Sequence, residues 1–143
     1  MADLLDGLAR HLQNNGLGTY QPNGVGGDIF IESLPSTPDV CTVLTLYGGP
    51  EPDARLPYDE PRLQVRCRGT QDPRISRARA QAVYELLQGA RRLTLPDGTY
   101  VVLVRALQSR PASMGQDEQR RHEHSINFQL DGTSSPTTNR PAE

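Results

Sequence analysis

Arginine is the residue type whose spacing in this sequence most clearly suggests chemistry. The stretch YDEPRLQVRCRG covers residues 58–69, and its alternate positions are Arg62, Gln64, Arg66 and Arg68. Alternate residues of a β-strand share one face, so this spacing predicts a row of guanidinium groups along a strand. Guanidinium groups hold carboxylates and phosphates through planar two-point contacts. The row therefore predicts a binding surface.

Residues that could catalyse a reaction or bind a metal are few. His122 and His124 would share a strand face, but their neighbours there are apolar, and the only other histidine, His11, lies in a remote helix. A metal site or a small hydrolase is therefore the weaker interpretation. Asp59 and Glu60 are paired carboxylates, and a turn before the next proline explains them. We predict no catalytic, metal or cofactor site, and no enzyme activity.

The composition favours one domain of a protein that stays in the cytosol where it is made. A chain of 143 residues fits a single domain. No segment approaches the roughly 20 apolar residues that span a bilayer. The first ten residues lack the basic and apolar regions of a signal peptide. Cys41 and Cys67 lie in apolar strand patterns, so we expect free, buried thiols.

The spacing of apolar residues predicts an α+β domain over residues 1–130, with a mainly antiparallel sheet and two helices packed on it. One helix is expected at residues 3–13, and a second from Asp72-Pro73 to Gly89. Strands are expected at residues 28–33, 39–47, 62–69, 91–95, 99–107 and 121–130, the last of them half-exposed. Residues 48–60 form a long loop and 109–119 a polar loop. The polar segment 131–143 is expected to be a disordered tail.

Charge is divided along the chain. Residues 28–60 hold seven acids and one arginine, net −6, whereas residues 61–92 hold eight arginines and two acids, net +6. These charges either cancel within the monomer as weak surface pairs or form separate patches that join copies head to tail. The candidates for a subunit contact are Asp53, Asp59 and Glu60 on the acidic side, and Arg62, Arg66, Arg68, Arg74 and Arg77 on the basic side.

Several stretches together resemble the bacteriophage tail terminator family over roughly residues 1–130. They are ADLLDGLARHL, DIFIESLP, VCTVLTLYGG, YDEPRLQVRCRG with the helix RISRARAQAVYELLQG, the hairpin LTLPDGTYVVLVRALQSRP, and HEHSINFQL. The most specific part is YDEPRLQVRCRG running into the helix. The family is divergent and has no catalytic signature.

The resemblance implies a structural subunit that forms a ring, usually a hexamer. Such a ring caps the tail tube of a long-tailed phage, ends tube polymerisation and provides the docking surface for the head connector. The implied partners are other copies of the chain, the tail tube protein and the head connector or stopper protein. No membrane is involved, and DNA at most passes through the lumen. The protein would belong to the tail or neck of the virion and assemble in the host cytoplasm.

Two alternatives to this assignment remain open. One is another virion protein, either a neck or connector-completion protein or a subunit related to the tail tube. The other is a small non-enzymatic protein that contacts nucleic acid through its arginines. The net charge of −2 and the aromatic content of 5% count against nucleic-acid binding.

Overall fold

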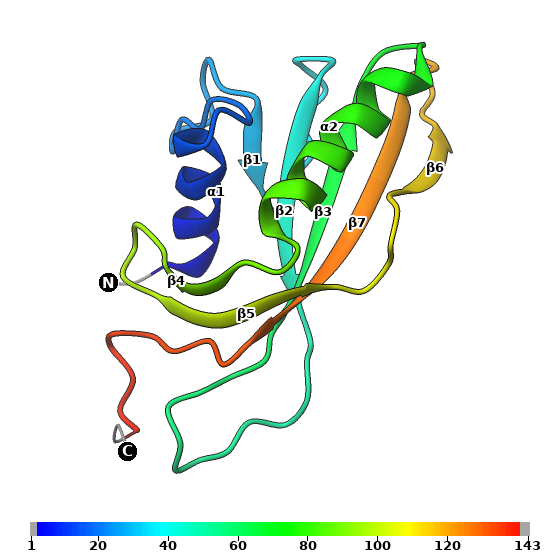
Figure 1. Cartoon of the computed structure of the whole chain (residues 1–143). Coiled ribbons are helices and arrows are strands. Elements are labelled where there is room, and N and C mark those ends of the chain that lie inside the picture. Colours follow the sequence, from blue (N-terminus) through cyan, green and yellow to red (C-terminus); the bar gives the residue numbers. More distant parts are fainter. Residues whose placement is uncertain (1–2, 141–143) are drawn as a thin grey trace.

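A computed structural model describes residues 3–140 as one sheet of seven strands with two helices on one of its faces (Figure 1). The elements in chain order are α1 (Leu4–Asn14), β1 (Ile29–Ile31), β2 (Cys41–Tyr47), β3 (Arg62–Arg68), α2 (Pro73–Leu87), β4 (Arg91–Thr94), β5 (Tyr100–Ala106), β6 (Ala112–Gln116) and β7 (His122–Asp131). This architecture confirms the predicted α+β class with a mainly antiparallel sheet. Neither α1 nor α2, the helices of the described part, has the length and apolar character to cross a bilayer.

Each of the two helices begins at an aspartate that caps its N-terminus. The Asp3 carboxylate accepts a hydrogen bond from the backbone N–H of Asp6 at 3.3 Å, and Asp72 accepts one from Arg74 at 3.0 Å. Pro73 occupies the first turn of α2, where its missing N–H costs no hydrogen bond. Beyond the end of α2, Gly89 has a φ of 80°, the left-handed conformation that ends many helices.

The sheet has the strand order β1-β2-β3-β7-β5-β4. Only β1 and β2 are parallel, and every other neighbouring pair is antiparallel. β7 lies at the centre, because β3 pairs with one of its edges while β6 and β5 share the other. Both helices cover the same face of this sheet (Figure 1).

The core lies between the helices and that face. Side chains from α1, α2, β3 and β7 meet there with almost no exposure, among them Leu8, Val83, Val65 and Phe128. Because side chains alternate along a strand, the arginines of β3 point to the opposite face, which no helix covers. The apolar alternation predicted for this strand is therefore confirmed.

The sequence-based description of β6 and β7 was wrong in two respects. Residues 109–119 were expected to form a polar loop, but Ala112–Gln116 forms the edge strand β6. All five of its residues are exposed, so no apolar pattern marked it. β7 was expected to be half-exposed, but its polar face is largely buried: Glu123 and Ser125 are each 5% exposed. Glu123 pairs with an arginine of β3, and the Ser125 hydroxyl contacts the Met114 sulfur of β6.

Residues 132–140 make defined contacts with the domain where the sequence predicted a disordered tail from Asp131 on. Thr133 is buried and exchanges two backbone hydrogen bonds of 2.8 Å with Asp59. Ser134 does the same with Tyr100, at 2.8 and 2.9 Å. The end of that tail, residues 141–143, lies outside the described residues.

Candidate functional site: the charged surfaces

The eight predicted contact residues lie on three elements and do not form one patch. The acids lie on the loop at residues 48–61 between β2 and β3, called the acidic loop below. The arginines of β3 point away from the helices, whereas Arg74 and Arg77 lie in α2, on the helix side. The predicted basic surface is therefore divided between the two sides of the sheet, which a linear charge count does not reveal.

Arg68 is buried within the chain, with 2% of its surface exposed. Its Nη2 donates to the backbone carbonyl of Pro38 at 2.6 Å, and its Nε donates to that of Asp39 at 3.0 Å. These bonds join the end of β3 to the segment that leads into β2. A subunit contact through Arg68 would require them to break.

Arg66 and Arg62 remain partly accessible on the helix-free face. Arg66 Nε lies 2.6 Å and Nη2 2.5 Å from the same oxygen of Glu123, whose side chain is 7% exposed while that of Arg66 is 41% exposed. Burial of the carboxylate strengthens its attraction to the guanidinium, and the loss of water around the carboxylate opposes that gain. Arg62 Nε is buried and has no hydrogen-bond partner among residues 3–140. Arg62 thus has a buried donor that no described residue satisfies.

The acidic loop uses two of its three candidate acids to hold its own shape. The Asp53 carboxylate accepts from the backbone N–H groups of Arg55 and Leu56, at 2.7 and 3.3 Å. Asp59 forms a two-point ion pair with Arg140 at 2.9 and 3.0 Å, and Arg140 also donates to the Asp53 carbonyl at 2.9 Å. The C-terminal segment therefore clamps the loop.

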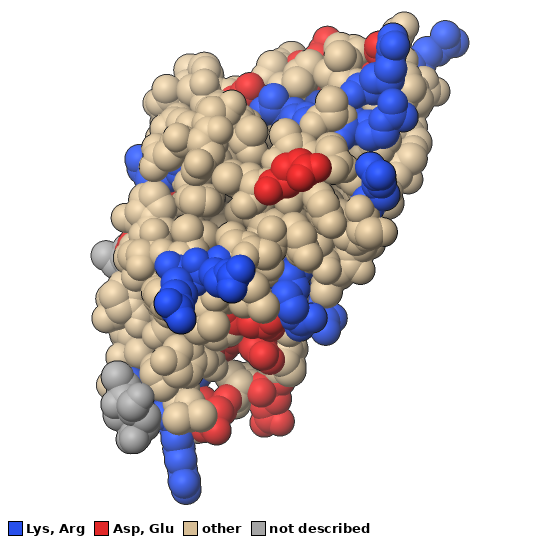
Figure 2. All heavy atoms as spheres, viewed as in Figure 1, with Lys and Arg blue, Asp and Glu red and all other residues tan. Residues whose placement is uncertain are grey.

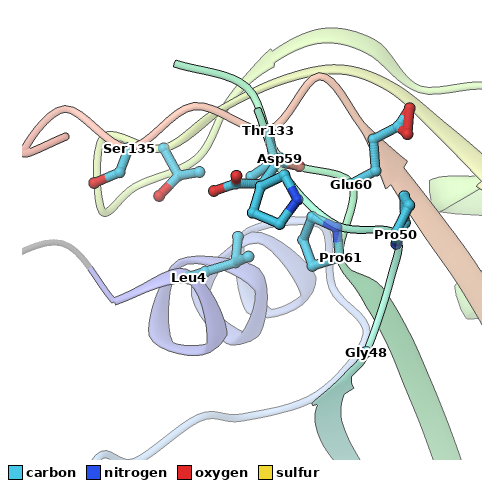
Figure 3. A pocket seen from close by; sticks show the side chains of 10 residues that line it. Leu4, Gly48, Pro50, Asp59, Glu60, Pro61, Thr133 and Ser135 are labelled. Carbon is cyan, nitrogen blue, oxygen red and sulfur yellow. The ribbon is translucent and has the colours of Figure 1, made fainter. Parts of the chain in front are cut away.

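A pocket of about 420 Å³ opens between the acidic loop, the C-terminal segment and the first turn of α1 (Figure 3). Leu4, Pro50 and Pro61 give it an apolar side. In Figure 3 the Asp59 carboxylate points toward the C-terminal segment, while the Glu60 carboxylate points away from it. Glu60 is exposed and has no ion-pair partner within the described chain. The pocket therefore combines an apolar side with the backbone and side chains of two acidic residues.

The histidines do not form a reactive site. His124 Nδ1 lies 2.7 Å from the hydroxyl of Ser76, and both side chains are buried between α2 and β7. Burial lowers the pKa of His124, and the positive charge of nearby Arg77 lowers it further. His122 instead contacts Gln116 of β6 at 3.2 Å. No group of three or more possible metal ligands occurs within residues 3–140.

Both cysteines are free and buried, as the sequence predicted. Desolvation raises the pKa of Cys67 to about 11. Its sulfur lies 3.6 Å from the Thr42 hydroxyl. A protonated, enclosed thiol is a poor nucleophile, so neither cysteine adds a reactive group to the charged surfaces.

Two arginines of these surfaces were missed by the sequence reasoning. Arg110 lies just before β6 and borders a groove on α2 with Arg74 and Arg77. Arg140 lies in the predicted tail. Neither position carried a signal: Arg110 fell in the expected polar loop, and nothing in the sequence linked Arg140 to the acidic loop.

The charged surfaces are separated on the molecule. Figure 2 shows acidic atoms gathered at the lower end, where the acidic loop extends in Figure 1, with some basic atoms beside them; a further group of basic atoms lies at the upper right, over the N-terminal half of α2. One ion pair joins the net −6 and net +6 segments: Arg79 Nη2 lies 3.2 Å from Asp28. Among the described residues, then, most of this charge is not cancelled between the two segments.

Comparison with known families matches residues 11–134 to a family described as bacteriophage tail terminator protein. The chain belongs to the bacteriophage tail terminator family. It is therefore a structural protein of the virion that associates with other phage tail or head proteins. The match confirms the resemblance seen in the sequence, and it includes the acidic loop, β3 and α2 but not Arg140. Searches of curated proteins and of solved structures returned no significant match.

Proposed function

We propose that this chain forms a ring that caps the phage tail tube, ends its polymerisation and provides the docking surface for the head connector. The observation that carries the proposal is the match to the tail terminator family over residues 11–134. The protein acts by binding its partners, without catalysing a reaction. It works at the tail or neck of the virion after assembly in the host cytoplasm.

The placement of charge supports a ring built from one repeated contact. An acidic surface at one end of a subunit and a basic surface at the other produce head-to-tail contacts, which close into a ring when the rotation allows. The acidic side offers Asp53, Asp59 and Glu60. The basic side offers Arg74 and Arg77 on α2 and Arg66 on the sheet. Arg62 begins β3 directly after the acidic loop and so lies near the acidic side, while Arg68 is buried and is left out. We take six copies as the ring size, with DNA passing through the lumen.

Electron microscopy of the purified protein, with and without tail tube protein, tests this function. The expected images show rings, and rings seated at tube ends when tube protein is present. The tubes should also become shorter as the terminator concentration rises. A chain that stays monomeric and has no affinity for tube or connector would contradict the proposal.

Deletion of the gene from the phage separates termination from a neck function. Loss of a terminator should produce overlong tails without attached heads. Tails of normal length that fail to join heads would instead assign the protein to the neck.

A further inference from the structure

α2 carries a groove of about 290 Å³ whose rim is basic. Arg74, Arg77, Ala78 and Gln81 line it from the helix, and Arg110 and Pro111 line it from the segment before β6; this is called the arginine groove below. Arg77 and Arg110 are exposed and have no ion-pair partner within the described chain. Arg74 pairs only with Asp72, and its side chain is 75% exposed. Such pairs at the surface contribute little and exchange readily.

The interior of this groove is less polar than its rim. The methyl group of Ala78 and the ring of Pro111 contribute carbon surface. Ile75, on the adjacent turn of α2, leaves 40% of its surface exposed. A segment that fills the groove should therefore combine carboxylates with large apolar side chains.

The acidic loop has that combination. Its exposed carboxylates include Glu51 and Glu60, and Leu56 and Tyr58 are 42% and 43% exposed. No other segment of the described chain presents exposed carboxylates beside two large exposed apolar side chains. The loop and the groove are complementary in charge and in apolar character.

The loop and the groove cannot meet within one subunit. The acidic loop extends from the end of the molecule opposite to the N-terminal half of α2 (Figure 1). The loop is also held in place, because Arg140 clamps Asp59 and the Asp59–Thr133 bonds close its base. A loop ordered before binding loses less conformational entropy when it binds.

We propose that the arginine groove of one subunit binds the acidic loop of a second copy of this chain. The inference rests on the proposed ring, and it assigns the contact to Arg74, Arg77 and Arg110 on the helix side, not to the arginines of β3. It adds Leu56 and Tyr58 as apolar contacts. The contact is directional, so each subunit binds one neighbour through its loop and another through its groove.

Charge reversal on each side tests the contact, with sedimentation velocity as the measurement. The groove variant is R77E/R110E, and the loop variant is E51R/E60R. Each alone places like charges together, and we expect self-association to weaken by at least about tenfold at low salt. Mixing the two variants pairs each reversed loop with a reversed groove and each native loop with a native groove. Association should then return in alternating assemblies with an even number of subunits.

A matched control reverses two exposed arginines outside the groove, in the variant R91E/R92E. It should assemble as the unmodified chain does, and thermal unfolding should show that every variant is folded. Failure of either single variant to weaken association, or failure of the mixture to recover it, would overturn the proposal. So would a groove variant that loses binding to duplex DNA and still self-associates, because the groove would then serve nucleic acid.

The loop–groove contact and the proposed terminator function can fail independently. An unmodified chain that stays monomeric alone at high concentration would refute the loop–groove contact, yet rings could still form on the tail tube. Rings that form through loop and groove but have no affinity for tube or connector would retain the contact and refute the terminator function.

Discussion

Replacing Arg68 with alanine should destabilise the fold itself. The side chain donates to two backbone carbonyls, those of Pro38 and Asp39, from a position with 2% exposure. A hydrogen bond from a charged donor contributes about 1.5–3 kcal/mol to stability. Pro38 and Asp39 are exposed residues, so water can reach their carbonyls after truncation and the lower value applies. Two such bonds give a loss of about 3 kcal/mol in the free energy of unfolding.

Urea and thermal unfolding measure this loss directly. For a chain of this size, about 3 kcal/mol corresponds to a fall of about 6–12 °C in Tm. Arg68→Lys keeps the charge but loses the planar fork, so it should fall between alanine and the unmodified chain. Arg77→Ala is the control, because that exposed side chain has no ion pair among residues 3–140; its unfolding free energy should change by less than about 0.5 kcal/mol.

One result would refute the reasoning. If Arg68→Ala unfolds as the unmodified chain does but fails to assemble, the residue acts in a subunit contact, as its charge first suggested. The bonds to the two carbonyls would then contribute little.

Three further predictions concern stability and reactivity. The free energy of unfolding should fall as the pH drops below 6.5, the ordinary pKa of histidine. Burial lowers the pKa of His124, so the unfolded chain binds more protons than the folded chain in this range. The unfolding free energy of His124→Gln should depend less on pH. Gly49→Ala should lower the free energy of unfolding by about 1–3 kcal/mol, because φ at Gly49 is 109° and the added Cβ would collide with the Glu60 carbonyl. Gly48→Ala is the comparison, because no atom lies near a Cβ at that position. Cys67, with a pKa of about 11, should resist an aromatic disulfide reagent at mildly alkaline pH until the chain is denatured.

Each of these predictions has an outcome that contradicts it. Stability that does not change with pH between about 7.5 and 5.5 would mean that His124 titrates normally in the fold. Equal unfolding free energies for the Gly48 and Gly49 variants would show that the base of the acidic loop adjusts to a side chain. Rapid labelling of the native protein would show that β3 opens often enough to expose its thiol.

Local signals predicted most of the fold. Asp72-Pro73 and Gly89 bounded α2, and the alternation of Leu63 and Val65 identified β3, because these features depend on neighbouring residues alone. β6 gave no such signal, because all of its residues are exposed and an exposed edge strand shows no alternation of apolar and polar residues. The burial of β7 depended on strands that flank it on both edges, which its own alternation could not reveal.

The sequence showed which segments carry charge, but not which charged side chains pair with one another. Arg66 meets Glu123 because the β3–β7 register sets Arg66 opposite Ser125, two residues from Glu123 on the same face of β7. That register is a tertiary property, and so is the contact between Asp59 and Arg140. The alternation of β3 assigned Arg68 to its polar face. Whether Arg68 is buried there depends on the segment at Pro38 and Asp39, which binds it. A charge count therefore overestimates how many arginines are free to bind.

The central position of β7 also sets the order in which the chain can fold. β7 is the most C-terminal strand of the described residues, yet β3, β5 and β6 all pair with it. Until residue 131 has been made, β3 and β5 have open edges that invite pairing with other chains. The sheet can close only after β7 has been made, and the Asp59–Arg140 pair forms after that. Chains that stop before β7 therefore keep these strand edges open.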